Sequence, residues 1–496
     1  MNPTNHDEIV READKVLNEN IKKVENSPYK MAYHIIPPAS WMNDPNGLIY
    51  WNGYYHVFYQ FHPFDVKTGW MHWGHVRSKD LVHWERLPIA LTPSNEYDRD
   101  GCFSGSAVDD NGILTLVYTG NIFIDREKDD VDECQCIATS ADGIHFEKFI
   151  NNPVIEEHPE EGSGHFRDPK VWKYNDEWYM VVGTRKDQIG KVLLYKSKDL
   201  RQWDYIGVMV ESDKEKGYMW ECPDLFELNG KHILITSPQG MEPEGDRYHN
   251  LYQTVYMIGD FDYTTGKYSY HTFEELDKGF DFYAAQTFED DKGRRILFAW
   301  MDIWESKMPS QNHGWAGSLT IPREVSFNER GQLVTKPVEE LQLLRKNEYE
   351  TELAAVQGEI LVDGLEGDVL EIIAEFDLSN IQASEVGLKV RCSEDNNEET
   401  VISYDVKTSK IIFNRDRSGE GDGGVRKAKL DLDSHKLKFH VYIDRSSMEL
   451  FVNEGEVVMS GRVYPKSTSR LVKVFSEGDV VSNVSIQAWE LEDVWK

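Results

Sequence analysis

The chain has 496 residues and a formal net charge of −33 at pH 7, because 87 Asp and Glu side chains outnumber 54 Lys and Arg. This acidic balance argues against a broad nucleic-acid surface and against binding to an anionic membrane, since both need clustered basic residues. Aromatic residues make up 12% of the chain, which excludes intrinsic disorder over most of its length. The length predicts two or three domains.

The N-terminal sequence and the cysteines indicate a compartment. No stretch approaches the roughly 18 consecutive apolar residues of a membrane span. The beginning of the chain is polar and acidic and lacks the basic and apolar regions of a secretory signal peptide. The cysteines are odd in number and form no Cys-x-x-Cys pair, which argues against a disulfide scaffold or a zinc cage. We therefore expect a cytoplasmic protein without a metal or cofactor.

The first two thirds of the chain predict a helix followed by repeated β-structure. Residues 8–25 carry apolar side chains at helical spacing, within an N-terminal extension over residues 1–32. Over residues 33–336 short apolar runs alternate with Asn-Gly, Asp-Gly and Pro turns. A unit with a start, a polar turn and an aromatic-rich strand recurs five times there. Repeats of this kind are the signature of a β-propeller, so we expect an all-β fold with five blades.

The repeats also predict where distant residues meet. Each repeat start would lie on the innermost strand of its blade, at one end of the central channel. This placement would gather residues that are far apart in the sequence, namely Asp44, Ser104, Asp168, Glu221 and Tyr283.

The C-terminal third has a different pattern of residues. A helical pattern begins at Pro337, and we expect a linker helix over residues 337–352. Over residues 353–496 tryptophan becomes rare and alternating strands dominate, which predicts an antiparallel β-sandwich.

Three acids at matched repeat positions are the strongest functional signal. A single Asp before Pro commonly only caps a turn. Burying Asp44, Asp168 and Glu221 together, however, carries a large desolvation and repulsion cost, which a functional site would explain. Glycoside cleavage needs a nucleophile, a general acid/base and stabilisation of an oxocarbenium-like transition state. The aromatic residues suit a sugar pocket, because flat rings bury the apolar faces of sugars.

The sequence neighbours of the acids divide these roles. The apolar run Tyr-Met-Trp before Glu221 should raise its pKa and keep it protonated as the acid. Amide donors around Asp44 should hold it ionised as the nucleophile. Arg167 should lower the pKa of Asp168, which suits the orientation of sugar hydroxyls and the stabilisation of positive charge.

Three motifs carry a resemblance to a known family. Trp41 to Gly47 (WMNDPNG), Arg167-Asp168-Pro169 and Trp220 to Pro223 (WECP) resemble the signature motifs of glycoside hydrolase family 32, the β-fructofuranosidases. The resemblance implies a five-bladed propeller followed by a β-sandwich and retaining hydrolysis of a terminal β-fructofuranoside. Asp44 would attack the fructosyl C2, Glu221 would act as acid and base, and Asp168 would stabilise the transition state.

The resemblance also predicts the sugar site. It implies fructose-binding residues at Asn43, Gln60, Trp73, Phe103, Ser104 and Arg167. Residues that flank the acids or share their repeat position complete the predicted substrate site: Trp41, Cys222 and Tyr283. Thr68 departs from the family pattern, in which many members carry a tryptophan, and this affects contacts to the leaving group.

The exact substrate is left open by the sequence. A cytoplasmic enzyme would meet sucrose or sucrose 6-phosphate, and a phosphate would need a local cation. The candidates by placement are Lys67, Arg185, Lys186, Arg247 and His313. Alternatives are a fructan exo-hydrolase, a fructosyltransferase, an arabinan-cleaving furanosidase and a non-catalytic sugar-binding protein. We expect a small sugar as the partner, no nucleic acid and no membrane, and the sequence is compatible with a homo-oligomer.

Overall fold

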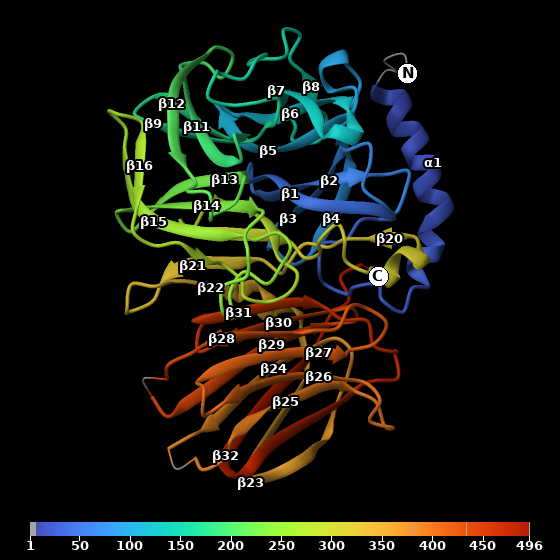
Figure 1. The fold of residues 1–496 in the computed structure, drawn as a ribbon. Helices are drawn as coiled ribbons and strands as arrows, with labels where there is room; N and C mark the ends of the chain where they lie inside the picture. The colour runs from blue at the N-terminus through green and yellow to red at the C-terminus, as the bar shows by residue number, and fades with distance from the viewer. Residues whose placement is uncertain (1–5, 380, 433, 496) are drawn as a thin grey trace.

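The computed structural model describes residues 6–379, 381–432 and 434–495, and these residues form a β-propeller with five blades followed by a β-sandwich (Figure 1). The predicted all-β fold class is therefore confirmed. The propeller occupies the upper part of Figure 1 and the sandwich, in orange and red, the lower part. Residues 1–5 of the predicted N-terminal extension lie outside the described residues.

Each blade is an antiparallel sheet whose strands follow one another in the chain. The first two blades contain β1 (Ser40–Trp51), β2 (Tyr54–His62), β3 (His72–Ser78), β4 (Trp84–Leu91), β5 (Gly101–Asp110), β6 (Ile113–Asp125), β7 (Asp130–Ser140) and β8 (Glu147–Lys148). The third and fourth contain β9 (Phe166–Tyr174), β10 (Glu177–Lys186), β11 (Ile189–Ser197), β12 (Trp203–Glu211), β13 (Met219–Leu228), β14 (Lys231–Gln239), β15 (Val255–Asp262), β16 (Lys267–Tyr270) and β17 (Glu274–Glu275). The last contains β18 (Tyr283–Glu289), β19 (Arg295–Trp300), β21 (Arg323–Phe327) and β22 (Leu333–Pro337).

The predicted repeats coincide with the blades. The five repeat starts lie on β1, β5, β9, β13 and β18, the first strand of each blade. The ring is closed by a short strand between β19 and β21. This strand, β20 (Trp315–Ala316), pairs in parallel with the beginning of β1. Short 3-10 helices lie in the connections: η1 (Glu96–Asp98), η2 (Arg126–Lys128) and η3 (Pro309–His313).

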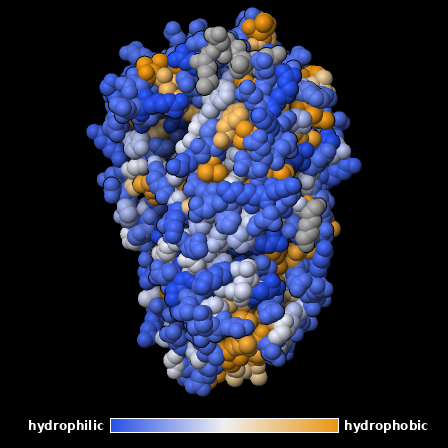
Figure 2. Space-filling view, turned by 90° about the vertical axis from the view of Figure 1, so that its right-hand side faces the viewer, coloured by the Kyte–Doolittle hydropathy of each residue, from blue (hydrophilic) through white to orange (hydrophobic). Residues whose placement is uncertain are grey.

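The predicted N-terminal helix is α1 (His6–Glu25), which lies along the outer side of the propeller (Figure 1). It buries Ile9, Ala13 and Val24 on one face. The molecular face on this side is mostly hydrophilic, with its apolar side chains in small separate patches (Figure 2). Within the described ranges, no helix is long and apolar enough to cross a membrane.

The predicted linker helix over 337–352 is wrong in length and type. The chain forms a 3-10 helix only over η4 (Glu339–Leu344), and β23 begins at Arg345. A helix cannot continue because the backbone from Arg345 pairs with the end of the chain, opposite Leu491.

The sandwich is built around two very long strands. β23 (Arg345–Glu366) and β32 (Leu471–Leu491) pair along their length, and β32 also pairs with β24 and β25. The other strands are β24 (Leu370–Asp377), β25 (Glu385–Cys392), β26 (Glu399–Asp405), β27 (Lys410–Arg417), β28 (Val425–Lys429), β29 (Lys436–Asp444), β30 (Ser447–Val452) and β31 (Val457–Arg462). Alternate side chains such as Ile372, Phe439 and Val474 are fully buried between the layers.

A buried charge network joins the sandwich to the propeller. Arg323 of β21 donates from Nη1 to Asp277 Oδ2 at 2.9 Å and from Nη2 to Glu449 of β30. Glu449 also accepts from His34 Nε2 at 3.0 Å, and Ser460 of β31 donates to Asp277 Oδ2 at 2.7 Å. The side chains of Arg323, Asp277 and Glu449 have no exposed area. Buried charges are tolerated only when every partner is present, so this network fixes how the two domains dock.

We predict that Arg323→Met destabilises the protein by about 3–5 kcal/mol, because two buried carboxylates lose their cation. Urea unfolding followed by tryptophan fluorescence measures this loss. Arg330→Met is the matched control: Arg330 lies 3.6 Å from Glu456 across the same interface but is 38% exposed. An exposed pair contributes roughly 1 kcal/mol or less. Equal losses in the two variants would contradict the prediction.

Candidate active site

The structure brings the three predicted acids together in one pocket at the end of the propeller channel. Asp44 comes from β1, Asp168 from β9 and Glu221 from β13, and all three line the same pocket. They are 7%, 4% and 8% exposed respectively. Three nearly dehydrated carboxyl groups therefore face a common space.

A β-bulge at the same place in every blade produces this convergence. At each repeat start the inner strand has one residue more than the stretch of the next strand that it faces. In β1, for example, Asn43 and Asp44 together face Gln60. Bulges re-aim side chains and interrupt pairing. Asp168, Cys222 and Ala284 adopt left-handed backbone with φ of 65°, 47° and 54°. Such residues carry about 1–3 kcal/mol of strain each, which functional sites commonly store.

The bulges correct one detail of the repeat alignment. Cys222 and Pro223 occupy the bulge of β13 in the place that Asp168 and Pro169 occupy in β9. Glu221 therefore corresponds to Arg167, one residue earlier. The sequence alone matched Glu221 with Asp168 because both acids stand near a proline.

Asp44 is held by hydroxyl and amide donors. Its Oδ2 accepts from Ser104 Oγ at 2.7 Å and its Oδ1 accepts from Asn43 Nδ2 at 3.0 Å. The Asn43 oxygen is in turn bound by Trp41 Nε1 at 2.8 Å. Burial nevertheless raises the pKa of Asp44 to about 6, and the charge of Glu221 adds to the rise. Desolvation thus outweighs the donors, but a pKa of about 6 is compatible with the expected ionised form near neutral pH.

Asp168 departs from its predicted electrostatics. Its Oδ2 accepts the backbone N–H of Cys222 at 2.9 Å. Burial and the charge of Glu221 raise the pKa of Asp168 well above its usual value, while Arg167 lowers it by less. The predicted decrease is wrong because the Arg167 guanidinium is turned toward other carboxylates.

Glu221 is the acid that Arg167 binds. Arg167 donates to Glu221 Oε1 from Nε at 2.9 Å and from Nη2 at 2.5 Å. The Tyr283 hydroxyl donates to Glu221 Oε2. Both carboxyl oxygens of Glu221 thus have donors, and its surroundings are more polar than its sequence neighbours predict.

The predicted substrate-binding residues divide into two groups. Five of them line the pocket: Asn43, Gln60, Phe103, Ser104 and Arg167. The other four are buried behind it: Trp41, Trp73, Cys222 and Tyr283. Members of this second group support the lining, as when Trp73 Nε1 donates to the Phe103 carbonyl at 3.0 Å and Cys222 Sγ to Asp44 Oδ2 at 3.7 Å.

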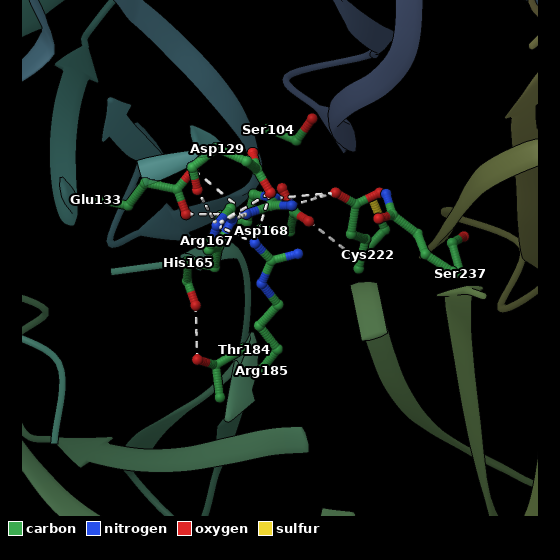
Figure 3. A network of polar contacts seen from close by, with 12 residues as sticks. Ser104, Asp129, Glu133, His165, Arg167, Asp168, Thr184, Arg185, Cys222 and Ser237 are labelled. Carbon is green, nitrogen blue, oxygen red and sulfur yellow. Dashed lines mark hydrogen bonds and ion pairs between the residues drawn. The ribbon is translucent and has the colours of Figure 1, made fainter. Parts of the chain in front are cut away.

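Sequence reasoning missed three charged or polar residues of the site, Asp129, Glu133 and His165. Arg167 Nη1 donates to Glu133 Oε2 at 3.1 Å and lies 3.0 Å from His165 Nδ1. Figure 3 shows Arg167 in the middle of this network, with Glu133 on one side and Asp168 on the other. Glu133 is 1% exposed on β7, the third strand of its blade. The available signal was the acidic run over residues 129–133 (DDVDE), which ends at Glu133 just before the segment that begins at Cys134.

The rim of the pocket contains apolar side chains. Met71, Phe103, Phe123 and Trp304 line the pocket, as does Thr68. Aromatic and apolar groups of this kind suit the carbon faces of a sugar.

Among the predicted phosphate candidates, Arg185 and Lys186 line a groove that shares Asp129 and His165 with the pocket. Arg185 Nη2 lies 2.5 Å from Asp129 Oδ2 and 2.5 Å from His165 Nε2. Arg247 instead pairs with Glu244 and Glu274, His313 packs edge-on against Tyr29, and the Lys67 carbonyl accepts from His62.

The arrangement supplies the parts that glycoside cleavage requires. Asp44 faces the pocket and, among the residues that the structure describes, has neutral donors and no cationic partner. Glu221 has donors at both oxygens, and Asp168 comes from the blade that precedes that of Glu221. A pair of carboxyl groups in unlike surroundings is what separates an acid from a nucleophile in glycosidases. The fold and the site are those of a glycosidase.

Comparisons with known proteins agree with this class. Residues 34–337 match the sequence model of the glycosyl hydrolases family 32 N-terminal domain, and residues 340–490 match that of the family 32 C-terminal domain. The chain therefore belongs to glycosyl hydrolase family 32. It is 42% identical to a sucrose-6-phosphate hydrolase of Zymomonas mobilis, across 95% of this chain and 94% of that protein. It is also 42% identical to a raffinose invertase of Escherichia coli, across 90% and 92%.

Solved structures give the same result. A Bombyx mori family 32 β-fructofuranosidase mutant in complex with sucrose has a TM-score of 0.88 and 39% identity, with 99% of each chain covered. The sucrose-6-phosphate hydrolase of Lactobacillus gasseri has a TM-score of 0.87 and 30% identity, with 97% of each chain covered.

We predict that Glu133→Gln lowers kcat for β-fructofuranoside hydrolysis roughly 10- to 100-fold, because Arg167 loses the carboxylate that positions it and small displacements cost that much. KM should change less, since Glu133 supports Arg167 from behind. The matched control is Asp132→Asn, whose exposed side chain lies next along β7. Steady-state kinetics and thermal unfolding check both variants. A variant that loses stability but keeps its kcat would show that Glu133 is only structural.

Proposed function

We propose that this protein is a β-fructofuranosidase that hydrolyses the terminal fructosyl group of sucrose or sucrose 6-phosphate with retention of configuration. The observation that carries the proposal is the contrast between two acids in one pocket. Asp44 is held by neutral donors, whereas Glu221 is held by Arg167 and Tyr283. The relatives named for sucrose or its phosphate support the substrate class.

The proposed reaction has two steps. Asp44 attacks the fructosyl C2 and forms an ester while Glu221 protonates the departing glycosidic oxygen. Glu221 then takes a proton from water, which attacks C2 and releases fructose and free Asp44. Arg167 holds Glu221 Oε1, so Oε2, beside the Tyr283 hydroxyl, carries the proton that is first given to the leaving oxygen and then regained from water.

Asp168 contributes through the shared charge of the site. Burial and mutual repulsion raise the pKa values of Asp44 and Asp168. Asp44 and Asp168 therefore retain a proton more readily than isolated carboxyls. As positive charge develops on the sugar, the carboxylate form of Asp168 becomes favourable and stabilises the transition state.

The leaving group meets the rim of the pocket. A glucosyl 6-phosphate would need to draw Arg185 away from Asp129, to which it is now paired. Sucrose needs no such exchange and can pack on the aromatic rim. A cytoplasmic location and a homo-oligomeric state stay predictions from the sequence.

The decisive experiment compares wild type with Glu221→Gln on sucrose, sucrose 6-phosphate, inulin and an arabinan. We expect fructose from the two sucrose substrates and a fall in kcat of about 10²–10⁴-fold in the variant, the usual contribution of a general acid. Glu227→Gln is the control, because Glu227 is exposed near the end of the same strand. Methanol added to the reaction should yield the β-methyl fructofuranoside, as retention requires.

Several outcomes would overturn the proposal. Arabinose release without fructose would indicate the arabinan-cleaving alternative. Faster cleavage of inulin than of sucrose would indicate a fructan exo-hydrolase, and oligofructosides at high sucrose would indicate a transferase. Sugar binding without turnover in both wild type and Glu221→Gln would indicate a non-catalytic protein.

The raised pKa of Asp44 predicts the acidic limb of the pH profile. We expect kcat/KM to fall as the pH drops through about 6, because protonated Asp44 cannot attack. Ser104→Ala removes a donor that favours the carboxylate, so the limb should move to higher pH. Ser106→Ala is the control on the same strand. The Ser106 hydroxyl donates to the Pro169 carbonyl, so this variant should leave the limb in place. A limb that is unchanged in Ser104→Ala would contradict the assignment.

A further inference from the structure

A second cavity lies at the opposite end of the same channel. It is lined by the far halves of all five inner strands, through Leu48, Ala107, Val171, Phe226 and Phe288. Its volume is ≈ 320 Å³, against ≈ 160 Å³ for the pocket that contains the acids. The proposed hydrolysis uses no residue of this cavity.

Three cationic side chains line the cavity: Lys170, Lys173 and Arg295. Lys173 is exposed, and of the other two Lys170 is the better balanced. Lys170 Nζ lies 3.1 Å from Asp224 Oδ2, and the Asp224 side chain has no exposed area. Arg295 of β19 has a side chain only 15% exposed, and its ion pair is a 3.6 Å contact with Glu289 Oε2. The Glu289 side chain is 65% exposed, so water screens it. The second acid at the cavity, Glu227, is also exposed.

The Arg295 guanidinium is prepared for a planar, negatively charged partner. Its central carbon lies 4.7 Å from the centre of the Phe226 ring, which supports one face of the group. Within the described ranges, the structure gives this guanidinium no hydrogen bond. Burial lowers the pKa of Arg295, in keeping with a cation that has lost water without gaining a full replacement.

Two further donors of the cavity wall are unsatisfied. His232 Nδ1 accepts the backbone N–H of Phe261 at 3.2 Å, so the proton of a neutral ring is on Nε2. In the part of the chain that the structure describes, His232 Nε2 and Thr287 Oγ1 are buried without a hydrogen-bond partner. Both residues line the cavity. Buried donors without partners are uncommon, which indicates that something in the cavity accepts from them.

We propose that this end of the propeller channel binds a small oxyanion of the phosphate or carboxylate type, with Arg295 as its main ligand. The fork of guanidinium donors matches two oxygens of such an anion. Thr287 and His232 supply neutral donors to the remaining oxygens, and the Lys170 ammonium adds a second positive charge nearby. One bound negative charge adds to the partial compensation that Asp224 and the exposed Glu289 give to the Arg295 charge. Binding depends on this local site, because the net charge of −33 repels anions at long range.

The test is calorimetric titration of the full chain with sodium phosphate and, separately, with sodium acetate, at constant ionic strength set with sodium chloride. We expect saturable binding of one anion per chain, weakened by more than about tenfold in Arg295→Gln, since a charged hydrogen bond contributes that much. The two salts distinguish a phosphate-type from a carboxylate-type ligand. Arg11→Gln is the charge-matched control, because Arg11 is exposed on α1; its affinity should equal that of wild type.

Further variants separate lost binding from lost folding. If Arg295→Gln unfolds, Thr287→Val removes one donor without removing a charge and should weaken binding less severely. Circular dichroism reports folding, so the result does not depend on sucrose hydrolysis. Absence of saturable binding in wild type, for both salts, would overturn the proposal. Equal binding by wild type and Arg295→Gln would place the anion elsewhere, for example at the catalytic end, and would overturn it too.

Discussion

Repulsion among three dehydrated carboxyl groups is the constraint around which the catalytic end of the molecule is built. Asp44, Asp168 and Glu221 share one pocket. Within the described residues that line it, Arg167 is the permanent cation, and it binds Glu221 rather than the other two acids. One cation cannot neutralise three acids, so protonation must absorb the excess charge. The raised pKa values at Asp44 and Asp168 are the consequence.

The propeller meets this constraint through its backbone. The acids come from three separate sheets, each of which is stabilised independently of the pocket. The bulge at each repeat start keeps strained residues such as Asp168 and Cys222 in place, and the Cys222 N–H bonds to Asp168 across two blades. The buried interface with the sandwich, centred on Arg323 and Glu449, then braces the ring from below. The propeller sheets and the sandwich interface therefore supply the stability that offsets the repulsion among the three acids.

The sequence was sufficient for the features that depend on chain periodicity. The five repeats predict the blades, and the acids at their starts predict the pocket, because a propeller brings all inner strands to one axis. The sequence was insufficient to predict which of several nearby groups a side chain binds in the folded protein. The adjacency of Arg167 and Asp168 suggested a pair, yet the bulge between β9 and β10 turns the guanidinium toward Glu221. Glu133 belongs to another blade, and the helical pattern after Pro337 gave way to strand pairing.

The distribution of cations along the channel connects these observations. Lys170 lies two residues beyond Asp168 on β9, close enough in the chain to have served the acids. Its ammonium is instead bound by Asp224 and by the Thr287 carbonyl. This pairing places the Lys170 charge beside Asp224 at the far end, where Asp224 and the exposed Glu289 offset the Arg295 charge only in part. The two ends of one channel therefore acquire opposite character from the same inner strands: a proton-rich acid site at one end and a cavity suited to an anion at the other.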